Sequence, residues 1–258
     1  MRRLKFTVSY DGTEYHGWQV QPGLPTIQGT LESVLGEIEK APVAVDGSGR
    51  TDAGVHALAQ VAACTLVNPI PVDNLRKAMN RLLPADIRVM SVEEAPGDFH
   101  PRFQAKAKTY EYRIWRDEIC PPFQRRYVYH FPYRIREQAF FDAAPVFVGS
   151  HDFTAFAAAD EKDEFGFSKV RTVYSSQMRH DGAMLIYRVR GSGFLKHMVR
   201  NLVGTMLEMA RGNLPLDGLQ DLLNRTAPGK ANHSAPARGL FLVSVEYEPA
   251  EIAPDPLW

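Results

Sequence analysis

The chain has 258 residues, enough for one large domain or for two closely packed halves. Hydrophobic residues make up 45% of it and charged residues 23%, a composition that excludes an intrinsically disordered protein. Lysine and arginine together number 30, as do aspartate and glutamate, so the net charge is zero and gives no sign of a nucleic-acid partner.

Cysteine usage and hydropathy exclude two further classes of protein. Cys64 and Cys120 are not in a C-x-x-C motif, so they predict no metal site, and Cys64 lies in an apolar run that predicts a core position. No signal-peptide segment follows the basic N-terminus, and no run reaches the ~18 apolar residues of a membrane span. We therefore expect a cytoplasmic protein with no membrane partner.

The first hundred residues predict a mixture of strands and helices. Apolar residues alternate with polar ones over 4–10, which is typical of a half-buried strand. Helical spacing over 31–38 predicts a helix, and either Thr26 or Thr30 is suited to cap its start. Further elements predicted here are a helix over 75–82 and a strand over 87–92.

The rest of the chain continues this mixture. Alternation over 109–115 predicts a strand, and the longest amphipathic helix is predicted over 195–209. Residues 136–148 are helical in composition, but Pro145 is expected to kink that helix or to end it early. Also predicted are a hairpin of strands 170–179 and 184–190, a short helix over 219–223, a loop over 226–238 and a closing strand over 240–247. Because both halves mix strands and helices, we predict the α+β class with antiparallel hairpins.

Charge is distributed unevenly along this neutral chain. Residues 1–100 contain 9 basic and 12 acidic side chains, whereas residues 101–130 contain seven basic and three acidic ones. Residues 186–211 contain five basic side chains and a single acidic one. The two basic segments either line a groove for a polyanion or are solvated faces balanced by nearby acids.

Segment 47–57, Gly-Ser-Gly-Arg-Thr-Asp-Ala-Gly-Val-His-Ala, is the most informative part of the sequence. Its three glycines hold a loop open and allow another backbone or a ligand to approach closely. Arg50 and Asp52 on such a loop indicate a site that handles charge. On the loop alone, an aspartate that hydrogen-bonds its own turn is the competing interpretation.

Two more side chains are candidates for the same site. Tyr110 lies among basic residues on its predicted strand, where a ring can stack on a base while cations bind phosphates; alternatively, Tyr110 and Tyr112 line the buried face of the sheet. Arg200 lies near the apolar face of the long helix and needs a carboxylate partner if it is buried. Asp52 is chemically suited to be that partner, and a surface arginine with its stem on the helix is the alternative.

Other site chemistries find no support in the residues. The eight histidines are scattered and form no metal-ligand motif, so no metal site is predicted. The glycine-rich loop is not followed by the Lys-Ser/Thr pair of a P-loop, and the chain has no serine nucleophile elbow. The chemistry that remains is that of an aspartate acting as nucleophile, acid or base.

Segment 49–57 resembles the signature loop of the bacterial tRNA pseudouridine synthase A family. Matches to the family occur in order over nearly the full length, at 10–13, 17–19, 99–103, 108–114, 151–153, 194, 197–201 and 239–240. Two departures, Pro101 and Pro145, lie outside the catalytic motifs and concern the local backbone more than the chemistry.

The resemblance implies a fold and a division of the chain. It implies the pseudouridine synthase fold, in which two α/β halves with a mostly antiparallel sheet form a central cleft. Residues 1–103 would carry the aspartate loop, and residues 104–258 would carry the tyrosine strand and the arginine helix. The two halves would be packed as one catalytic unit.

Four site residues follow from their positions in the family's motifs. Asp52 matches the essential catalytic aspartate, and Arg50 matches the arginine that helps to displace and replace the target base. Tyr110 matches the tyrosine that packs against the flipped uracil, and Arg200 matches the basic residue that pairs with the catalytic carboxylate.

The implied activity is isomerisation of uridine to pseudouridine at positions 38–40 of the tRNA anticodon stem-loop, by a homodimer that needs no metal or organic cofactor. Whether Asp52 attacks C1′ of the ribose, attacks C6 of the base or removes the 2′ proton is left open. The alternatives are a non-catalytic RNA-binding paralogue and the same isomerase acting on another RNA.

Overall fold

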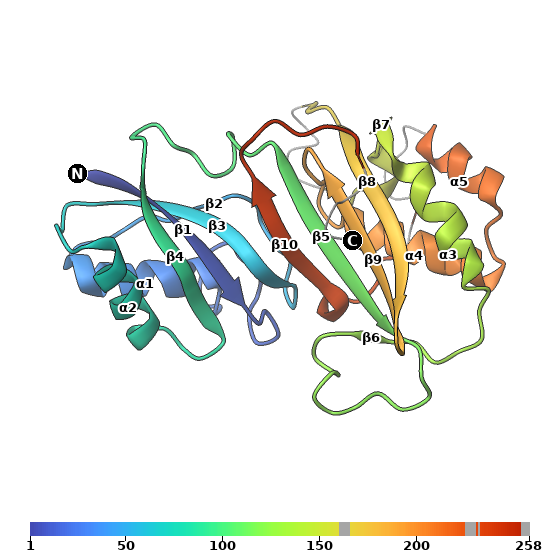
Figure 1. Cartoon of the computed structure of the whole chain (residues 1–258), viewed down its shortest axis with the longest axis horizontal. Coiled ribbons are helices and arrows are strands. Elements are labelled where there is room, and N and C mark those ends of the chain that lie inside the picture. The colour runs from blue at the N-terminus through green and yellow to red at the C-terminus, as the bar shows by residue number, and fades with distance from the viewer. Residues whose placement is uncertain (160–165, 225–230, 232, 254–258) are drawn as a thin grey trace. The chain divides into compact units, whose positions relative to one another are not determined.

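The computed structural model describes residues 1–159, 166–224, 231 and 233–253 (Figure 1). Contacts divide the chain into two compact units, and the first consists of residues 1–105 and 241–248. The second consists of residues 106–240 and 249–258. The division therefore places the last strand with the N-terminal residues, whereas the sequence prediction assigned it to the second half.

The first unit contains one sheet in the order β4-β1-β3-β10, with β2 also on β3. The strand β1 (Arg2–Tyr10) pairs antiparallel with β3 (His56–Leu66) and with β4 (Ile87–Ala95). The short β2 (Asp46–Gly47) is antiparallel to β3, and β10 (Leu240–Glu246) is parallel to it. β3 has neighbours along both edges and is therefore central to this unit.

Two helices, α1 (Ile27–Glu39) and α2 (Val72–Leu82), accompany this sheet. Thr26, and not Thr30, caps α1, because its Oγ1 accepts the N–H of Gly29 at 3.3 Å. The predicted alternation of β1 is confirmed by the burial of Leu4, Phe6, Val8 and Tyr10. The side chains that the two helices bury include Ile27, Leu31, Leu35, Leu75 and Met79.

The second unit contains the antiparallel sheet β5-β9-β8-β7. Its strands are β5 (Ala107–Trp115), β7 (Gly149–Asp152), β8 (Val170–Asp181) and β9 (Met184–Gly191). The short β6 (Tyr129–His130) runs parallel to β5. The predicted hairpin is confirmed as β8 and β9, and the strands of both units confirm the α+β class with mostly antiparallel pairing.

The helices of the second unit differ from prediction in where they begin and end. α3 (Gln138–Ala143) gives way to a 3-10 turn, η1 (Ala144–Phe147), at Pro145, as expected of a residue that cannot continue a helix. α4 (Met198–Arg211) begins three residues later than the predicted helix, because His197 has a left-handed backbone with φ of 61°.

Three smaller elements complete the described fold of the second unit: α5 (Leu216–Leu223), η2 (Thr154–Phe156) and η4 (Ala237–Gly239). Of the predicted loop over 226–238, residues 226–230 and 232 lie outside the described residues; residues 233–236 are in neither helix nor strand, and η4 begins at Ala237. In the part of the chain that the structure describes, no helix is both long and apolar enough to cross a membrane.

The two cysteines provide a test of this fold. Cys64 is fully buried, as predicted, and burial raises the pKa of its thiol to about 12, whereas Cys120 is partly exposed. Because the thiolate is the reactive form, we expect one thiol to react with Ellman's reagent at pH 8 in the native protein and two in guanidinium chloride. The variant Cys120→Ser should show no reaction when native; rapid reaction of Cys64 there would contradict the buried position.

Candidate active site

Thr51 anchors the loop that carries Arg50 and Asp52. Its side chain is buried, its Oγ1 is hydrogen-bonded to the Tyr10 hydroxyl at 2.8 Å, and its carbonyl accepts the N–H of Trp18 at 3.0 Å. Arg50 is exposed and Asp52 is half-buried. The loop thus inserts one residue into the core and presents the side chains on either side of it.

Further hydrogen bonds fix the loop before and after this anchor. Gln60, which is fully buried on β3, donates its Nε2 to the carbonyl of Gly49 at 2.8 Å. The Ser48 hydroxyl donates to Oε1 of the same amide at 2.5 Å. On the other side, the N–H of Gly54 donates to the Tyr15 carbonyl at 3.3 Å. These bonds hold Arg50 and Asp52 on a backbone that is prearranged for a ligand.

Two glycines of the loop are required by geometry. Gly54 has φ of 75°, in the left-handed region that favours glycine. A Cβ at Gly47 would lie 2.5 Å from the buried indole of Trp18, so only glycine lets that ring pack there. The same Trp18 donates to Thr51, which links the packing at Gly47 to the anchor of the loop.

His56 closes the loop and was not predicted as a functional residue. It is 1% exposed, its Nδ1 accepts the N–H of Gly12 at 3.1 Å, and its ring stacks on Phe241 of β10 at 4.7 Å. Its place within the segment 49–57 was the only available signal, since neither spacing nor composition indicates a buried histidine. Its contacts are those of a residue that supports the loop.

Tyr110 lies on β5 in the second unit. It is 8% exposed. Its ring and the ring of Phe194 pack edge to face, with their centroids 5.1 Å apart. Tyr112, two residues along the strand, is fully buried and donates its hydroxyl to the Pro236 carbonyl at 2.7 Å. Burial raises the pKa of the Tyr112 phenol, which keeps that hydroxyl protonated. Both tyrosines thus belong to a packed sheet face.

Arg200 lies in the first turn of α4 and is held from two directions. Its Nε donates to the carbonyl of Ala235 at 2.8 Å, and the N–H of Ala235 donates back to the carbonyl of Arg200 at 3.1 Å. The next residue, Asn201, donates its amide to the Phe156 carbonyl at 2.6 Å. The guanidinium is therefore oriented by the backbone at 235, and it is partly buried, not on an open surface.

The four predicted residues thus fall into two pairs. Arg50 and Asp52 share one loop of the first unit, and Tyr110 and Arg200 belong to the second unit. Among the described residues, no group of three or more histidine, cysteine, aspartate or glutamate side chains is arranged to hold a metal ion.

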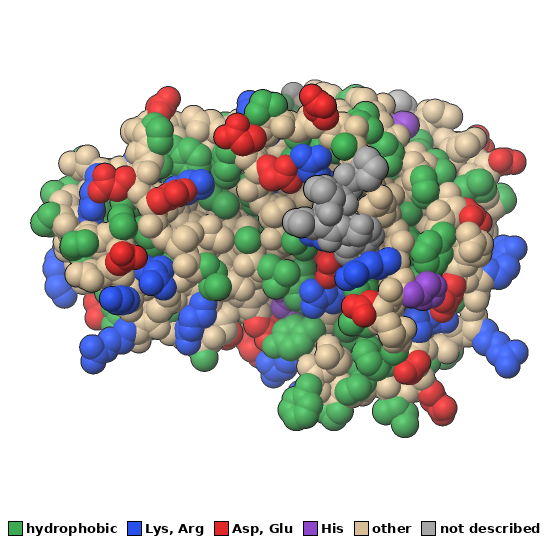
Figure 2. Space-filling model, in the orientation of Figure 1, with side chains coloured by type: hydrophobic (Ala, Val, Ile, Leu, Met, Phe, Trp, Pro, Cys, Tyr) green, Lys and Arg blue, Asp and Glu red, His purple; other side chains and the backbone are tan. Residues whose placement is uncertain are grey.

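Several arginines of the two basic segments are balanced locally by acids. Arg113 pairs with Glu111 at 2.8 Å, Arg116 with Glu137 at 2.7 Å and Arg211 with Glu208 at 2.6 Å. Figure 2 shows acidic and basic side chains interspersed over the visible face. Part of the basic excess is therefore balanced by nearby acids, as one of the two interpretations expected.

Comparison with known proteins assigns the family. A family model described as tRNA pseudouridine synthase matches residues 7–104 and 143–248. A tRNA pseudouridine synthase A of Solibacter usitatus (strain Ellin6076) is 59% identical over 247 residues, which cover 96% of this chain and 100% of the relative. The chain belongs to the tRNA pseudouridine synthase family and is an isomerase.

More distant relatives agree with this assignment. Proteins named tRNA pseudouridine synthase A from Anoxybacillus flavithermus (strain DSM 21510 / WK1) and Lacticaseibacillus casei (strain BL23) are 42% and 43% identical, each over 96% of this chain and 100% of the relative. Likeness to a solved archaeal box H/ACA sRNP Nop10–Cbf5 complex is low, with a TM-score of 0.33 and 12% identity over 80% of this chain and 43% of that chain. The family assignment therefore rests on sequence.

The contact between Gly47 and Trp18 generates a prediction. In Gly47→Ala the new methyl group must displace the buried indole of Trp18, the residue whose backbone N–H donates to the Thr51 carbonyl. We expect a loss of stability of about 1–3 kcal/mol and a fall in turnover of roughly tenfold or more. Urea denaturation and tritium release from labelled tRNA measure the two effects.

Gly97→Ala is the matched control, since a Cβ there meets nothing within 4 Å. This control should keep both properties near those of the natural protein. Equal stability and equal turnover in Gly47→Ala and Gly97→Ala would show that the contact with Trp18 does not position the loop.

Proposed function

We propose that this protein isomerises uridine to pseudouridine at positions 38–40 of the tRNA anticodon stem-loop, as a cytoplasmic homodimer. The observation that carries the proposal is the placement of Arg50 and Asp52 on either side of the buried Thr51. Membership of the tRNA pseudouridine synthase family supports the reaction class, and the resemblance of segment 49–57 supports the choice of Asp52.

The reaction requires no net loss or gain of atoms by the substrate. The bond from N1 of uracil to C1′ breaks, a bond from C5 to C1′ forms, C5 loses its proton, and N1 gains one. Asp52 acts as nucleophile or base through its carboxylate. For either role the carboxylate must lie at the reacting centre. The detached base must stay bound while it turns, and exclusion of water prevents its loss by hydrolysis.

Arg50 suits a different role because it is exposed and lies next to the anchor of the loop. Taking a uridine out of the helical stack costs a few kcal/mol, and a planar guanidinium that enters the vacated space recovers part of that cost by stacking. We assign this role to Arg50. The backbone bonds around Gly49 and Thr51 limit the motion of the loop and favour a fixed point of insertion.

For Tyr110 and Arg200 we propose the roles that the resemblance implies. The Tyr110 ring would pack against the flipped uracil, and its edge contact with Phe194 supports this by fixing the plane of the ring. Arg200 would pair with the catalytic carboxylate, and its bond to Ala235 supports this by restricting the guanidinium to one orientation.

The variant Asp52→Asn tests the catalytic assignment. The amide matches the carboxylate in size but cannot act as nucleophile or base, so we expect turnover to fall by at least about 10³-fold. Release of tritium from tRNA labelled at uracil C5 measures turnover, and carbodiimide-primer extension on tRNA maps the modified positions.

The control is the binding of Asp52→Asn to unmodified tRNA, which should match that of the natural protein, together with an unchanged unfolding midpoint. Turnover near the natural rate in Asp52→Asn would remove that residue from the mechanism. Tight binding of tRNA without isomerisation by the natural protein would indicate a non-catalytic paralogue. Isomerisation of another RNA, with positions 38–40 untouched, would replace the proposed substrate.

A further inference from the structure

The segment 98–104 carries an aromatic pair, one ring of which is exposed, that has no part in the site proposed above. Phe103 is 77% exposed, and its ring centroid lies 4.2 Å from that of His100. Arg102 and Lys106 beside it are also exposed. A single exposed ring is ordinary on a protein surface, so its meaning depends on how rigidly it is held.

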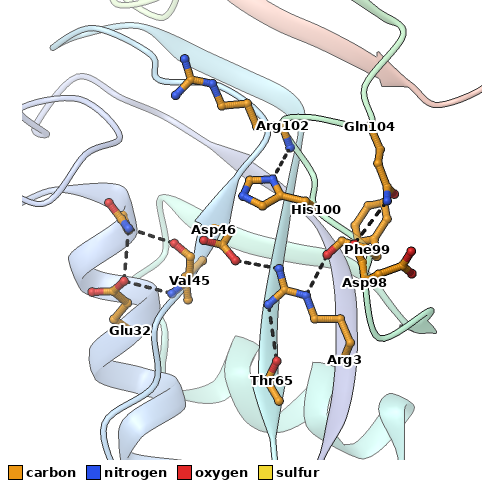
Figure 3. Close-up of polar contacts among 11 residues, drawn as sticks. Arg3, Glu32, Val45, Asp46, Thr65, Asp98, Phe99, His100, Arg102 and Gln104 are labelled. Carbon is orange, nitrogen blue, oxygen red and sulfur yellow. Dashed lines mark hydrogen bonds and ion pairs between the residues drawn. The ribbon is translucent and has the colours of Figure 1, made fainter.

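Arg3 of β1 fixes the start of this segment from below, as Figure 3 shows. Its Nε donates to the carbonyl of Phe99 at 3.0 Å, and its Nη2 pairs with Asp46 of β2 at 2.6 Å. The Arg3 side chain is only 12% exposed. A charge-assisted hydrogen bond from a shielded guanidinium is stronger than one between neutral groups. Arg3 therefore holds the backbone of Phe99 firmly in place.

The middle of the segment is held by Tyr247, the residue that follows β10, and by packing. Phe99 is 8% exposed and packs with Val61, Ala63 and Tyr247, whose ring lies 5.2 Å from its own. The Tyr247 hydroxyl donates to the carbonyl of Pro101 at 2.9 Å, and burial raises the pKa of that phenol, which keeps the donor protonated. Proline at 101 fixes φ, so this departure from the family pattern stiffens the segment.

Local hydrogen bonds then set the orientation of the His100 ring. Its Nδ1 accepts the N–H of Arg102 at 3.2 Å, and its carbonyl accepts the N–H of Gln104 at 3.2 Å (Figure 3). With Nδ1 as acceptor, neutral His100 carries its proton on Nε2 and is a donor there. The exposed ring of Phe103 therefore rests on a second ring that the backbone holds in place.

The location of the segment relates it to the catalytic loop within the first unit. Asp46, which Arg3 binds, begins the strand that leads directly into Ser48, Arg50 and Asp52. In Figure 3, Arg102 lies at the top and Thr65 at the bottom. Thr65 is the second-last residue of β3. β3 begins at His56, so Arg102 is displaced toward the end of β3 at which the catalytic loop lies.

We propose that His100, Arg102 and Phe103 form a platform that binds RNA beside the target uridine, with an unpaired base stacked on Phe103 and a phosphate bound by Arg102. The inference rests on the proposed function, which supplies an RNA with unpaired loop nucleotides. Residues 99–110 contain three basic and no acidic side chains, which favours a polyanion over a protein surface as the occupant. Stacking needs no base-specific contact and suits an enzyme that acts on several neighbouring positions.

The variant Phe103→Ala tests the platform. The ring is exposed, so the fold should be unaffected, and we expect Kd for unmodified tRNA to rise on the order of tenfold, as for the loss of one stacked base. The rise should appear equally in KM, with kcat at saturating tRNA close to that of the natural enzyme. Phe103→Trp should restore binding, whereas Phe103→Leu, which is apolar without a stacking face, should not.

Two further variants sharpen this experiment. Arg102→Ala should weaken binding and lower the slope of log Kd against log salt concentration by about one, as expected for one lost phosphate contact. Met90→Ala removes another exposed apolar side chain of the first unit and should leave Kd unchanged. Unfolding midpoints of all variants should agree.

The outcomes separate the platform from the proposed function. If the natural enzyme isomerises tRNA and Phe103→Ala keeps its Kd within twofold, the platform is wrong and the proposed function stands. A Phe103→Leu variant with natural affinity would replace stacking by simple apolar contact. A fall in kcat without a change in Kd would show that the segment acts only through the catalytic loop. A natural protein that isomerises no tRNA would overturn both proposals.

Discussion

The site depends on the burial of one threonine. Thr51 is held in the core by the hydroxyl of Tyr10 and by the backbone of Trp18, and Arg50 and Asp52 flank it. A flexible glycine-rich loop would lose conformational entropy each time it bound substrate. Anchoring the loop at its centre means that this entropy is lost during folding instead. The first turn of α1 contributes to keeping that anchor in place, because Ile27 and Gln28 donate their N–H groups to the carbonyls of Gly17 and Trp18.

Much of the fold follows from hydrophobic periodicity. The strand β1 alternates clearly, because one of its faces is more buried than the other, and the hairpin β8-β9 was predicted from two strand-like runs on either side of a turn. The central strand β3 was not predicted, since its residues are buried nearly throughout and no alternation marks it. The start of α4 was predicted too early, because apolar spacing continues through His197 while the backbone there is not helical. Periodicity reports burial and not dihedral angles.

The site was predictable to a lesser extent. Glycine content and the charged pair predicted that Arg50 and Asp52 lie on a loop. The structure confirms that both lie outside helices and strands. The side chains that fix the loop, Gln60 and His56, were not predicted, because a buried polar residue is identified by its partner and the partner is distant in sequence. The roles of all four candidate residues came from resemblance to a family, and composition alone would not have assigned them.

The position of β10 has a consequence for how the protein is made. Phe241 and Leu242 pair in parallel with His56 and Ala57, so the first unit is completed by residues that leave the ribosome only after residues 106–240 of the second unit. Until then the first residues of β3 lack their neighbour in β10, and the buried His56 lacks the ring on which it stacks. Strand edges without neighbours are prone to wrong pairing during synthesis. The loop that carries Arg50 and Asp52 thus reaches its final support only after residues 106–240 have been synthesised, which delays an RNA-modifying activity until then.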